Sequence, residues 1–277
     1  MDRDQLMQQY DFSGKTVVLT GGTGVLGREM ACGLVGLGAN VAVLDKNTEI
    51  PEEYRQPLDA GPGKYLVVYG DVLDRGKLEA ARDEILLAFG RIDVLINAAG
   101  GNYPGATTNP EQAFSDLPKE ALQFTFDLNL LGTILPCQVF GQEMIKNQSG
   151  VIVNITSMAA DRPLTRIPAY AAAKAGVSNF TRWLAVHMAQ EYSPQIRVNA
   201  LAPGFFLTSQ NRFLLMQEDG ESLTARGQAI ISHTPLARFG SPDDLLGTLF
   251  WLLSDASQFV TGIVVPVDGG FSAFSGV

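Results

Sequence analysis

Short runs of apolar residues recur along the chain, and longer segments with helical spacing separate them. The apolar runs are rich in β-branched residues and do not alternate with polar positions, which is typical of strands covered on both faces in a parallel sheet. Seven runs fit this description: KTVVLT (15–20), NVAVLD (40–45), YLVVYG (65–70), IDVLIN (92–97), VIVNIT (151–156), IRVNAL (196–201) and GIVVPVD (262–268). The pattern therefore predicts seven strands.

Helical spacing is found between these runs, over 25–37, 74–89, 118–147, 168–192 and 241–254. In DLPKE and GSPDD a proline stands in the first turn with acids nearby, which favours a helix start. Pro136, by contrast, interrupts the third segment and should kink it. Alternation of strands and helices predicts βαβ units and a doubly wound, parallel seven-stranded α/β sheet, the Rossmann fold. Because no repeat or linker divides the chain, we expect residues 1–277 to form one domain.

One long segment departs from this alternation, because residues 205–240 lie between the sixth strand and the last helix. In an open α/β sheet, ligands bind beyond the carboxyl ends of the strands, and this segment leaves from such an end. Long connections are often functional. We therefore expect 205–240 to be a helical substrate lobe or lid. A surface decoration without a role in binding is the alternative.

Composition narrows the class of partner. Hydrophobic residues make up 46% and charged residues 18% of the chain, which is ordinary for a folded globular protein rather than a disordered one. The net charge of −9 argues against nucleic acid and anionic membranes as partners, since both bind basic surfaces. No apolar run approaches the roughly 20 residues needed to cross a bilayer. We therefore expect a small-molecule partner.

The cysteines and histidines carry no disulfide or metal signature. Cys32 and Cys137 lie in apolar segments without Cys-x-x-Cys spacing, so we expect two buried free thiols in a reducing compartment. His187 and His233 cannot by themselves supply a three-ligand metal site. The N-terminal residues show no apolar segment of the kind found in secretory signals. A metal-free, cytoplasmic protein is expected.

The first strand leads into TGGTGVLGREM, in which Gly21, Gly24 and Gly27 are spaced as G-x-x-G-x-x-G and open a helix. Such a turn lets a pyrophosphate approach bare backbone at the helix N-terminus. Asp45 closes the second strand, where a carboxylate accepts hydrogen bonds from ribose hydroxyls and repels a 2′-phosphate. The sequence thus predicts a dinucleotide site that favours NAD (NADH) over NADP, although Lys46 could tolerate a phosphate.

A second group of polar residues is expected at the same edge of the sheet. The fifth strand ends in NITSMAA, which places Ser157 at its carboxyl end, and the next helix carries Tyr170 and Lys174 in AYAAAKAG. Residues i and i+4 share a helix face, so the ammonium would lie beside the phenol and favour its ionised form. A helix that simply carries two polar residues is the plain alternative.

Together these motifs resemble the classical short-chain dehydrogenase/reductase family: TGGTGVLG, NAAG at 97–100, Ser157 followed by Tyr-x-x-x-Lys, and APGFFLT at 202–208. The similarity spans essentially the whole chain. It implies that Tyr170 exchanges a proton with the substrate oxygen, while Lys174 binds the nicotinamide ribose and lowers the pKa of the phenol. It also implies that Ser157 bonds the substrate oxygen and that Asn129, in FDLNLLG, holds a proton-relay water.

The resemblance further implies a set of cofactor contacts. Asp71 and Val72 match positions beside the adenine, 97–100 match the adenosine ribose, and the loop after the sixth strand matches the nicotinamide amide. The full set is Gly21, Thr23, Gly24, Val25, Leu26, Gly27, Asp45, Lys46, Asp71, Val72, Asn97, Ala98, Ala99, Gly100, Tyr170, Lys174, Pro203, Gly204, Phe206 and Thr208. The glycine turn departs from the usual T-G-x-x-x-G-x-G pattern, because Val25 stands at the second family glycine. This departure affects which contacts residues 23–26 make with the cofactor, but it does not change which cofactor is expected.

Longer stretches, among them NAAGGNYPGATT (97–108) and RPLTRIPAYAAAKAG (162–176), are similar to the D-mannonate oxidoreductase (fructuronate reductase) group within this family. That similarity implies NADH-linked reduction of D-fructuronate to D-mannonate, a step of carbohydrate metabolism. A sugar acid carries a carboxylate, which arginine binds well. The expected substrate contacts are Asn102, Ser157, Arg162, Arg166 and Arg212. Each arginine could equally be a solvated or interface residue.

Three alternatives stay open. Gluconate 5-dehydrogenase and 3-ketoacyl carrier-protein reductase share the implied fold and catalytic set, although the acidic composition and Asp45 count against the carrier-protein enzyme. A non-catalytic NAD-binding protein would be expected to lack Ser157, Tyr170 or Lys174, and all three are present. The resemblance also implies a homotetramer assembled through the two long helical segments and the last strand.

Overall fold

The predicted doubly wound sheet is confirmed. The computed structural model describes residues 2–208, 212–219 and 222–276. Its seven strands pair in parallel in the order β3-β2-β1-β4-β5-β6-β7. They are β1 (Thr16–Thr20), β2 (Asn40–Asp45), β3 (Lys64–Tyr69), β4 (Val94–Asn97), β5 (Gly150–Ile155), β6 (Ile196–Pro203) and β7 (Val264–Val267).

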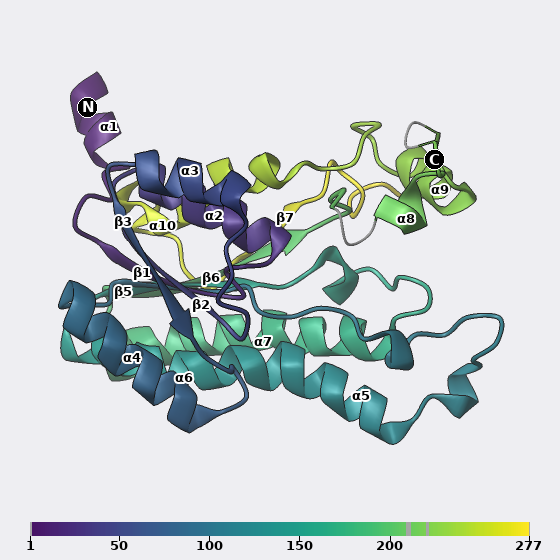
Figure 1. The fold of residues 1–277 in the computed structure, drawn as a ribbon, viewed down its shortest axis with the longest axis horizontal. Helices are drawn as coiled ribbons and strands as arrows, with labels where there is room; N and C mark the ends of the chain where they lie inside the picture. Colours follow the sequence, from purple (N-terminus) through teal and green to yellow (C-terminus); the bar gives the residue numbers. More distant parts are fainter. Residues whose placement is uncertain (1, 209–211, 220–221, 277) are drawn as a thin grey trace.

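Helices cover both faces of the sheet (Figure 1). The α-helices are α1 (Arg3–Gln8), α2 (Val25–Gly36), α3 (Glu52–Ala60), α4 (Arg75–Phe89), α5 (Lys119–Phe126), α6 (Gly132–Lys146), α7 (Pro168–Glu191), α8 (Arg212–Leu215), α9 (Ala225–Ser232) and α10 (Leu246–Leu253). Short turns complete the chain: η1 (Pro104–Ala106), η2 (Phe114–Asp116), η3 (Asp127–Leu131), η4 (Met158–Ala160), η5 (Pro242–Leu245) and η6 (Asp255–Ser257). In Figure 1, α2, α3 and α10 lie above the sheet, and α4, α6 and α7 lie below it.

Two apolar cores result, one on each face of the sheet. Val17 and Leu19 of β1 join the core beneath α2 and α10, whereas Val18 between them joins the core formed with α4, α6 and α7. Successive side chains of a strand point to opposite faces. An unbroken apolar run is therefore what a strand covered on both sides requires, and the prediction made from that pattern holds.

The position of β1 determines where a ligand can bind. β1 pairs with β2 on one side and with β4 on the other, so the direction of winding reverses there. In open α/β sheets the crevice outside the carboxyl ends of the strands at this reversal is the usual binding site. The glycine turn follows β1, and the NAAG segment follows β4, so both lie at this crevice.

Three expectations about helices need correction. First, α1 and α3 were not predicted; α3 has few apolar residues and contains Pro57, so its sequence lacks a helical signal. Second, 118–147 is not one regular helix, since the π-helical segment η3 separates α5 from α6. Third, Pro136 does not interrupt the helix, because α6 continues past it to Lys146. The irregular segment is η3, where the Gly132 N–H bonds the carbonyl of Asp127 five residues back.

Candidate active site

The glycine turn packs directly on the end of β4. Gly21 has φ +68°, and a Cβ there would lie 2.7 Å from the Cα of Ala99. A Cβ on Gly27 would meet the carbonyl oxygen of Gly21. Gly24 forms the N-cap of α2 without a side-chain cap. The first N–H groups of α2 therefore face the crevice from a turn that has no room for side chains at Gly21 and Gly27, as a pyrophosphate site requires.

Asp45 lies beside this turn at the end of β2. Its Oδ2 accepts hydrogen bonds from the Thr23 hydroxyl at 2.7 Å and from the Thr23 N–H at 3.2 Å, while its Oδ1 accepts one from the Asn47 N–H at 3.2 Å. These bonds hold the half-buried carboxylate in a fixed orientation next to the crevice. A ribose hydroxyl arriving there would meet an acceptor that is already positioned.

Lys46 is paired with Asp71 instead of facing the crevice alone. Its ammonium lies 3.0 Å from Oδ2 of Asp71, and Oδ1 of the same carboxylate accepts the Leu73 N–H at 3.0 Å. Burial opposes ionisation of Asp71, yet the Leu73 N–H and Lys46 together hold its pKa below the ordinary value. The charge of Lys46 is thus largely balanced by a carboxylate, which leaves it poorly suited to receive a 2′-phosphate.

The segment after β4 contributes mainly backbone to the crevice. Asn97 is buried in the core, where its amide donates to Oδ1 of Asn154 at 2.9 Å and to Sγ of Cys137 at 3.2 Å. Its side chain therefore points away from any cofactor. The N–H groups of Ala98 and Ala99 both donate to the Thr20 hydroxyl at 3.2 Å. Val72, also expected at the adenine, is buried in the apolar core near Gly132.

Asn129 lies in η3 and is fully buried. Its amide nitrogen donates to the carbonyls of Gly101 at 2.9 Å and Thr125 at 2.8 Å, and its Oδ1 accepts the Gly101 N–H at 3.0 Å. Both amide hydrogens are therefore used. The side chain clamps the segment after β4, and a role in holding water stays a prediction.

Ser157, Tyr170 and Lys174 converge at the carboxyl end of β5. Ser157 caps η4, where its hydroxyl accepts the Ala159 N–H at 3.2 Å, and the same hydroxyl is near enough to the Tyr170 phenol to lower the pKa of that phenol. Tyr170 lies in the first turn of α7, which Pro168 starts. Nζ of Lys174 lies 5.8 Å from the centroid of the Tyr170 ring, and it donates to the carbonyl of Ile155 at 2.8 Å.

The NAAG segment connects this cluster to the glycine turn. A Cβ on Gly100 would lie 2.8 Å from Oδ1 of Asn129 and 3.2 Å from Nζ of Lys174. Gly100 thus touches the proposed catalytic groups, while Ala99 of the same segment touches Gly21. The dinucleotide turn and the Ser–Tyr–Lys cluster therefore line one continuous region at the edge of the sheet.

Burial shifts the pKa values of both titratable members of the cluster. It raises the pKa of Tyr170, an effect that the nearby hydroxyl of Ser157 only partly offsets. It lowers the pKa of Lys174 to about 8. The expectation that Lys174 lowers the phenol pKa is therefore not met in this structure. Desolvation disfavours the phenolate, and the buried ammonium of Lys174 donates to the carbonyl of Ile155.

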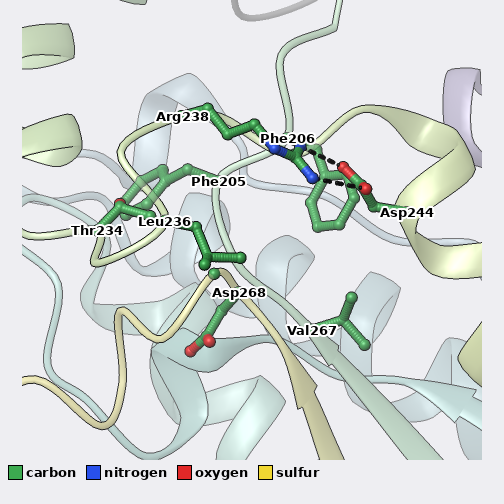
Figure 2. Close-up of a pocket in the computed structure, with 10 residues that line it drawn as sticks. Phe205, Phe206, Thr234, Leu236, Arg238, Asp244, Val267 and Asp268 are labelled. Carbon is green, nitrogen blue, oxygen red and sulfur yellow. Dashed lines mark hydrogen bonds and ion pairs between the residues drawn. The ribbon is translucent and has the colours of Figure 1, made fainter.

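The loop after β6 presents its backbone, not its aromatic side chains, to the end of the sheet. The N–H of Gly204, which follows Pro203, donates to the carbonyl of Val267 at 2.9 Å. Phe206 is buried and packs on Gly240, and Figure 2 shows its ring beside Arg238 and Asp244. Any contact of Phe206 with a nicotinamide would thus be made by backbone. Thr208 is the last residue that the structure describes before the gap at 209–211.

A cavity of about 230 Å³ lies under the lobe, and none of Ser157, Tyr170 and Lys174 lines it. Figure 2 shows the side chains around it. Its walls include Phe206, Arg238, Asp244 and Asp268. Arg238 forms a two-point ion pair with Asp244, at 2.6 and 2.8 Å. This pair fastens the end of the lobe to η5, so the cavity is best understood as space beneath the lobe.

The expected substrate residues do not all gather at one place. Arg162 donates from Nε to the carbonyl of Ser272 at 2.8 Å, which holds the C-terminal segment. Asn102 donates to the Thr107 hydroxyl at 2.7 Å, within its own loop. Arg212 begins α8 in the lobe. Arg166 directly follows Thr165, which lines a second cavity described below, and the same cavity is lined by Arg226, an α9 residue that no sequence motif singled out.

Neither thiol is paired, and only one is fully buried. Cys137 is buried and Cys32 is half-buried, so the expectation for Cys32 is corrected. Burial raises the pKa of Cys32 to about 11 and that of Cys137 to about 12, so both are weak nucleophiles. Over residues 2–208, 212–219 and 222–276, no helix is long and apolar enough to cross a bilayer. Within the same ranges, no group of three metal-binding side chains is found.

Known proteins resemble this chain along nearly its whole length. A family model described as enoyl-(acyl carrier protein) reductase matches residues 23–272. UxuB, an uncharacterised oxidoreductase of Bacillus subtilis, is 48% identical and covers 96% of this chain and 98% of its own length. An uncharacterised oxidoreductase of Haemophilus influenzae is 43% identical and covers 97% of this chain and 96% of its own length.

A solved structure agrees with the fold. The crystal structure of a Haemophilus influenzae protein provisionally identified as a D-mannonate oxidoreductase, with NAD bound, has a TM-score of 0.89 and 42% identity. The match covers 96% of this chain and 98% of that one. The matched lengths leave no large part of the chain without a counterpart.

Proposed function

The chain belongs to the short-chain dehydrogenase/reductase family of oxidoreductases, and from this premise we propose that it reduces the keto group of a sugar acid with NADH. The favoured substrate is D-fructuronate and the product D-mannonate. The observation that carries the proposal is the Ser157–Tyr170–Lys174 cluster, placed through Gly100 against the glycine turn. The substrate rests on the similarity to the protein provisionally identified as a D-mannonate oxidoreductase.

The crevice fits a nicotinamide dinucleotide. The space around Gly21 and Gly27 excludes side chains and leaves the start of α2 open to a pyrophosphate. The fixed carboxylate of Asp45 would accept hydrogen bonds from the adenosine ribose and repel a 2′-phosphate. Because Lys46 is paired with Asp71, it offers little compensation for that repulsion. These features support NAD over NADP, as does the NAD bound in the similar structure.

Tyr170 would act as the general acid of the reduction. The raised pKa keeps its phenol protonated at neutral pH, so it can donate a proton to the ketone oxygen. The hydroxyl of Ser157, which acts on the phenol, would bond the same oxygen and orient it. The cofactor, when bound, supplies the hydride that reaches the carbonyl carbon. The products are a secondary alcohol and a Tyr170 phenolate, which regains its proton from solvent.

Lys174 would make this proton transfer easier. Its ammonium is fixed on the Ile155 carbonyl and lies close to the Tyr170 ring, so a positive charge stands near the phenolate that forms. The same group would bind ribose hydroxyls of the nicotinamide half. Asn129 would keep the backbone around Gly101 in place beside them.

We also infer that residues 205–240 form the substrate lobe of a single catalytic domain and that the chain assembles as a homotetramer. The lobe leaves from the carboxyl end of β6, at the same edge of the sheet as the cluster (Figure 1). The tetramer is supported by large apolar side chains that α5, η3 and α7 leave exposed: Phe124, Leu131, Trp183 and Val186. Such patches mark interaction surfaces.

A substrate panel tests the proposed function. NADH oxidation is followed with D-fructuronate, 5-ketogluconate and an acetoacetyl thioester, and repeated with NADPH. We expect the highest kcat/KM with D-fructuronate and NADH. A preference for 5-ketogluconate would indicate a gluconate 5-dehydrogenase, and a preference for the thioester with NADPH would indicate a carrier-protein reductase. No turnover of any ketone would contradict an enzymatic role.

A further inference from the structure

A second cavity, of about 250 Å³, lies between the lobe and the segment that joins Ser157 to Tyr170. Its walls are mostly apolar and carry two polar side chains from the lobe, Arg226 and His233. The residues that line it are Pro163, Leu164, Thr165, Phe205, Arg226, Ala229, Ile230, His233 and Phe271. Apolar walls with a few polar groups are typical of small-molecule sites.

Arg226 is one of the arginines that no carboxylate accompanies in the described part of the chain. It is half-buried in the first turn of α9. Five other arginines pair with carboxylates: Arg55, Arg75, Arg82, Arg91 and Arg238. In the part of the chain that the structure describes, no ion pair or hydrogen bond of the Arg226 side chain is found. A partly desolvated cation without a partner is unfavourable. The guanidinium of Arg226 therefore lowers the stability of the fold, even in a protein of net charge −9.

A second arginine stands close to the first. Burial lowers the pKa of Arg226, and the nearby charge of Arg166 lowers it further. Arg166 itself has φ +75°, a conformation that residues with side chains rarely adopt, and the Thr108 N–H bonds its carbonyl at 2.9 Å. Backbone strain of this kind is often found at functional sites. The charge of Arg166 therefore acts on Arg226, and Arg166 follows Thr165 of the cavity wall directly in the chain.

We propose that Arg226 and Arg166 together bind the carboxylate of the substrate, with Arg226 making the principal contact. The planar guanidinium of Arg226 suits a two-point bond to a carboxylate. An anion between the arginines would relieve their mutual repulsion and supply the missing counter-ion. This inference rests on the proposed function and names the residue that selects acids over neutral ketoses.

His233 would bind a hydroxyl of the same substrate. Its Nδ1 lies 2.8 Å from the carbonyl of Ala229, and a carbonyl can only accept, so the neutral ring holds its proton on Nδ1. Nε2 is then an acceptor, suited to a sugar hydroxyl. Thr165 on the cavity wall precedes Tyr170 by five residues, and the proposal requires an acid held at Arg226 to extend its remaining carbons toward the Ser157–Tyr170 pair.

The test compares acids with neutral ketoses that differ only at the carboxylate. D-Fructose replaces the carboxylate of D-fructuronate by a hydroxymethyl group, and L-sorbose does the same for 5-ketogluconate. In Arg226→Gln we expect KM for the acid to rise on the order of 10- to 100-fold, with little change in kcat or in kcat/KM for the ketose. Arg226→Lys should recover part of this loss, and Arg166→Gln should show a smaller rise. Arg75→Gln, which breaks an exposed ion pair on α4, is the control.

The outcomes separate this inference from the proposed function. If the wild type prefers 5-ketogluconate, D-fructuronate is wrong as the substrate, and a selective rise in KM for 5-ketogluconate in Arg226→Gln still supports the anion site. An unchanged KM for the preferred acid in Arg226→Gln would overturn the inference, and so would an equal loss with the acid and its ketose. A wild type that reduces only neutral ketones would overturn both.

Discussion

The ammonium of Lys174 on α7 donates a hydrogen bond of 2.8 Å to the carbonyl of Ile155, the last residue of β5. In the reverse direction, the hydroxyl of Thr156 donates to the carbonyl of Lys174, also at 2.8 Å. This reciprocal contact fixes the helix against the strand end. The register of Tyr170, one turn earlier on α7, relative to Ser157 follows from it.

Replacing the phenol tests the proton transfer. In Tyr170→Phe we expect kcat to fall on the order of 10²- to 10⁴-fold, because the general acid is lost while the ring still fills its place. The dissociation constant for NADH, measured by fluorescence titration, should stay nearly unchanged. Tyr192→Phe, at the other end of the same helix, should keep full activity and serves as the control. Turnover near that of the wild type in Tyr170→Phe would contradict the assignment.

Replacing the buried ammonium should stabilise the fold at neutral pH. The pKa of Lys174 falls from 10.5 to about 8 on folding, so the unfolded chain binds more protons between those values. The resulting penalty, about 3 kcal/mol, is fully present below pH 8 and disappears as the pH rises toward 10.5. Lys174→Met loses the bond to Ile155, at about 1 kcal/mol. We therefore expect a net gain of about 2 kcal/mol at pH 7.

The measurement is urea unfolding of wild type and Lys174→Met at pH 7 and at pH 10. The variant should be the more stable protein at pH 7 and lose that advantage at pH 10, while its activity is low at both. A difference in unfolding free energy that does not depend on pH would show that the charge of Lys174 is not desolvated in the fold.

Cofactor choice should depend on Asp45 far more than on Lys46. In Asp45→Ser we expect the ratio of kcat/KM for NADH to that for NADPH to fall on the order of 10- to 100-fold, because the ribose acceptor and the charge that repels a 2′-phosphate are both removed. Lys46→Ala should change this ratio little, since its ammonium is engaged by Asp71. A larger effect from Lys46→Ala than from Asp45→Ser would contradict the assignment of the NADH preference to Asp45.

Two glycines of the same turn should respond differently to an added methyl group. Gly21→Ala combines φ +68° with a contact at 2.7 Å to Ala99, so we expect a loss of at least about 1–3 kcal/mol in unfolding free energy and weak NADH binding. Gly24→Ala has an ordinary φ of −68° and meets only the Gly21 carbonyl at 3.2 Å. Its stability should stay close to that of the wild type, as thermal unfolding of the two variants can show.

The sheet could be predicted from sequence because both of its faces are buried. Val17, Val18 and Leu19 enter two different cores, so the run must be apolar without interruption, and that pattern is visible in the residues alone. The grouping of Ser157, Tyr170 and Lys174 was equally accessible, since the order of strand and helix places them at one edge. The elements that could not be predicted are those whose sequences carry a weak or irregular signal, such as α3 with its internal Pro57.

Electrostatics and side-chain direction could not be read from the residues. The pKa of Tyr170 depends on how much water burial removes, and spacing from Lys174 says nothing about that. The partners of Asn97 and Arg162 depend on which way each side chain turns. Arg226 stands in no motif, and only the folding of the lobe over Pro163–Thr165 places it at a cavity.

Because of the π-helical segment η3, the number of residues in the continuous helix from α5 to α6 determines the geometry of the site. A π turn holds one residue more than an α-helix needs for the same number of turns. Deleting a single residue within 127–131 would let the helix from α5 to α6 become regular. The same deletion would rotate Asn129 by about 100° around the helix axis. The hydrogen bonds between Asn129 and Gly101 would then be lost. Relatives that differ in length here should therefore differ in the site, even where their folds superpose.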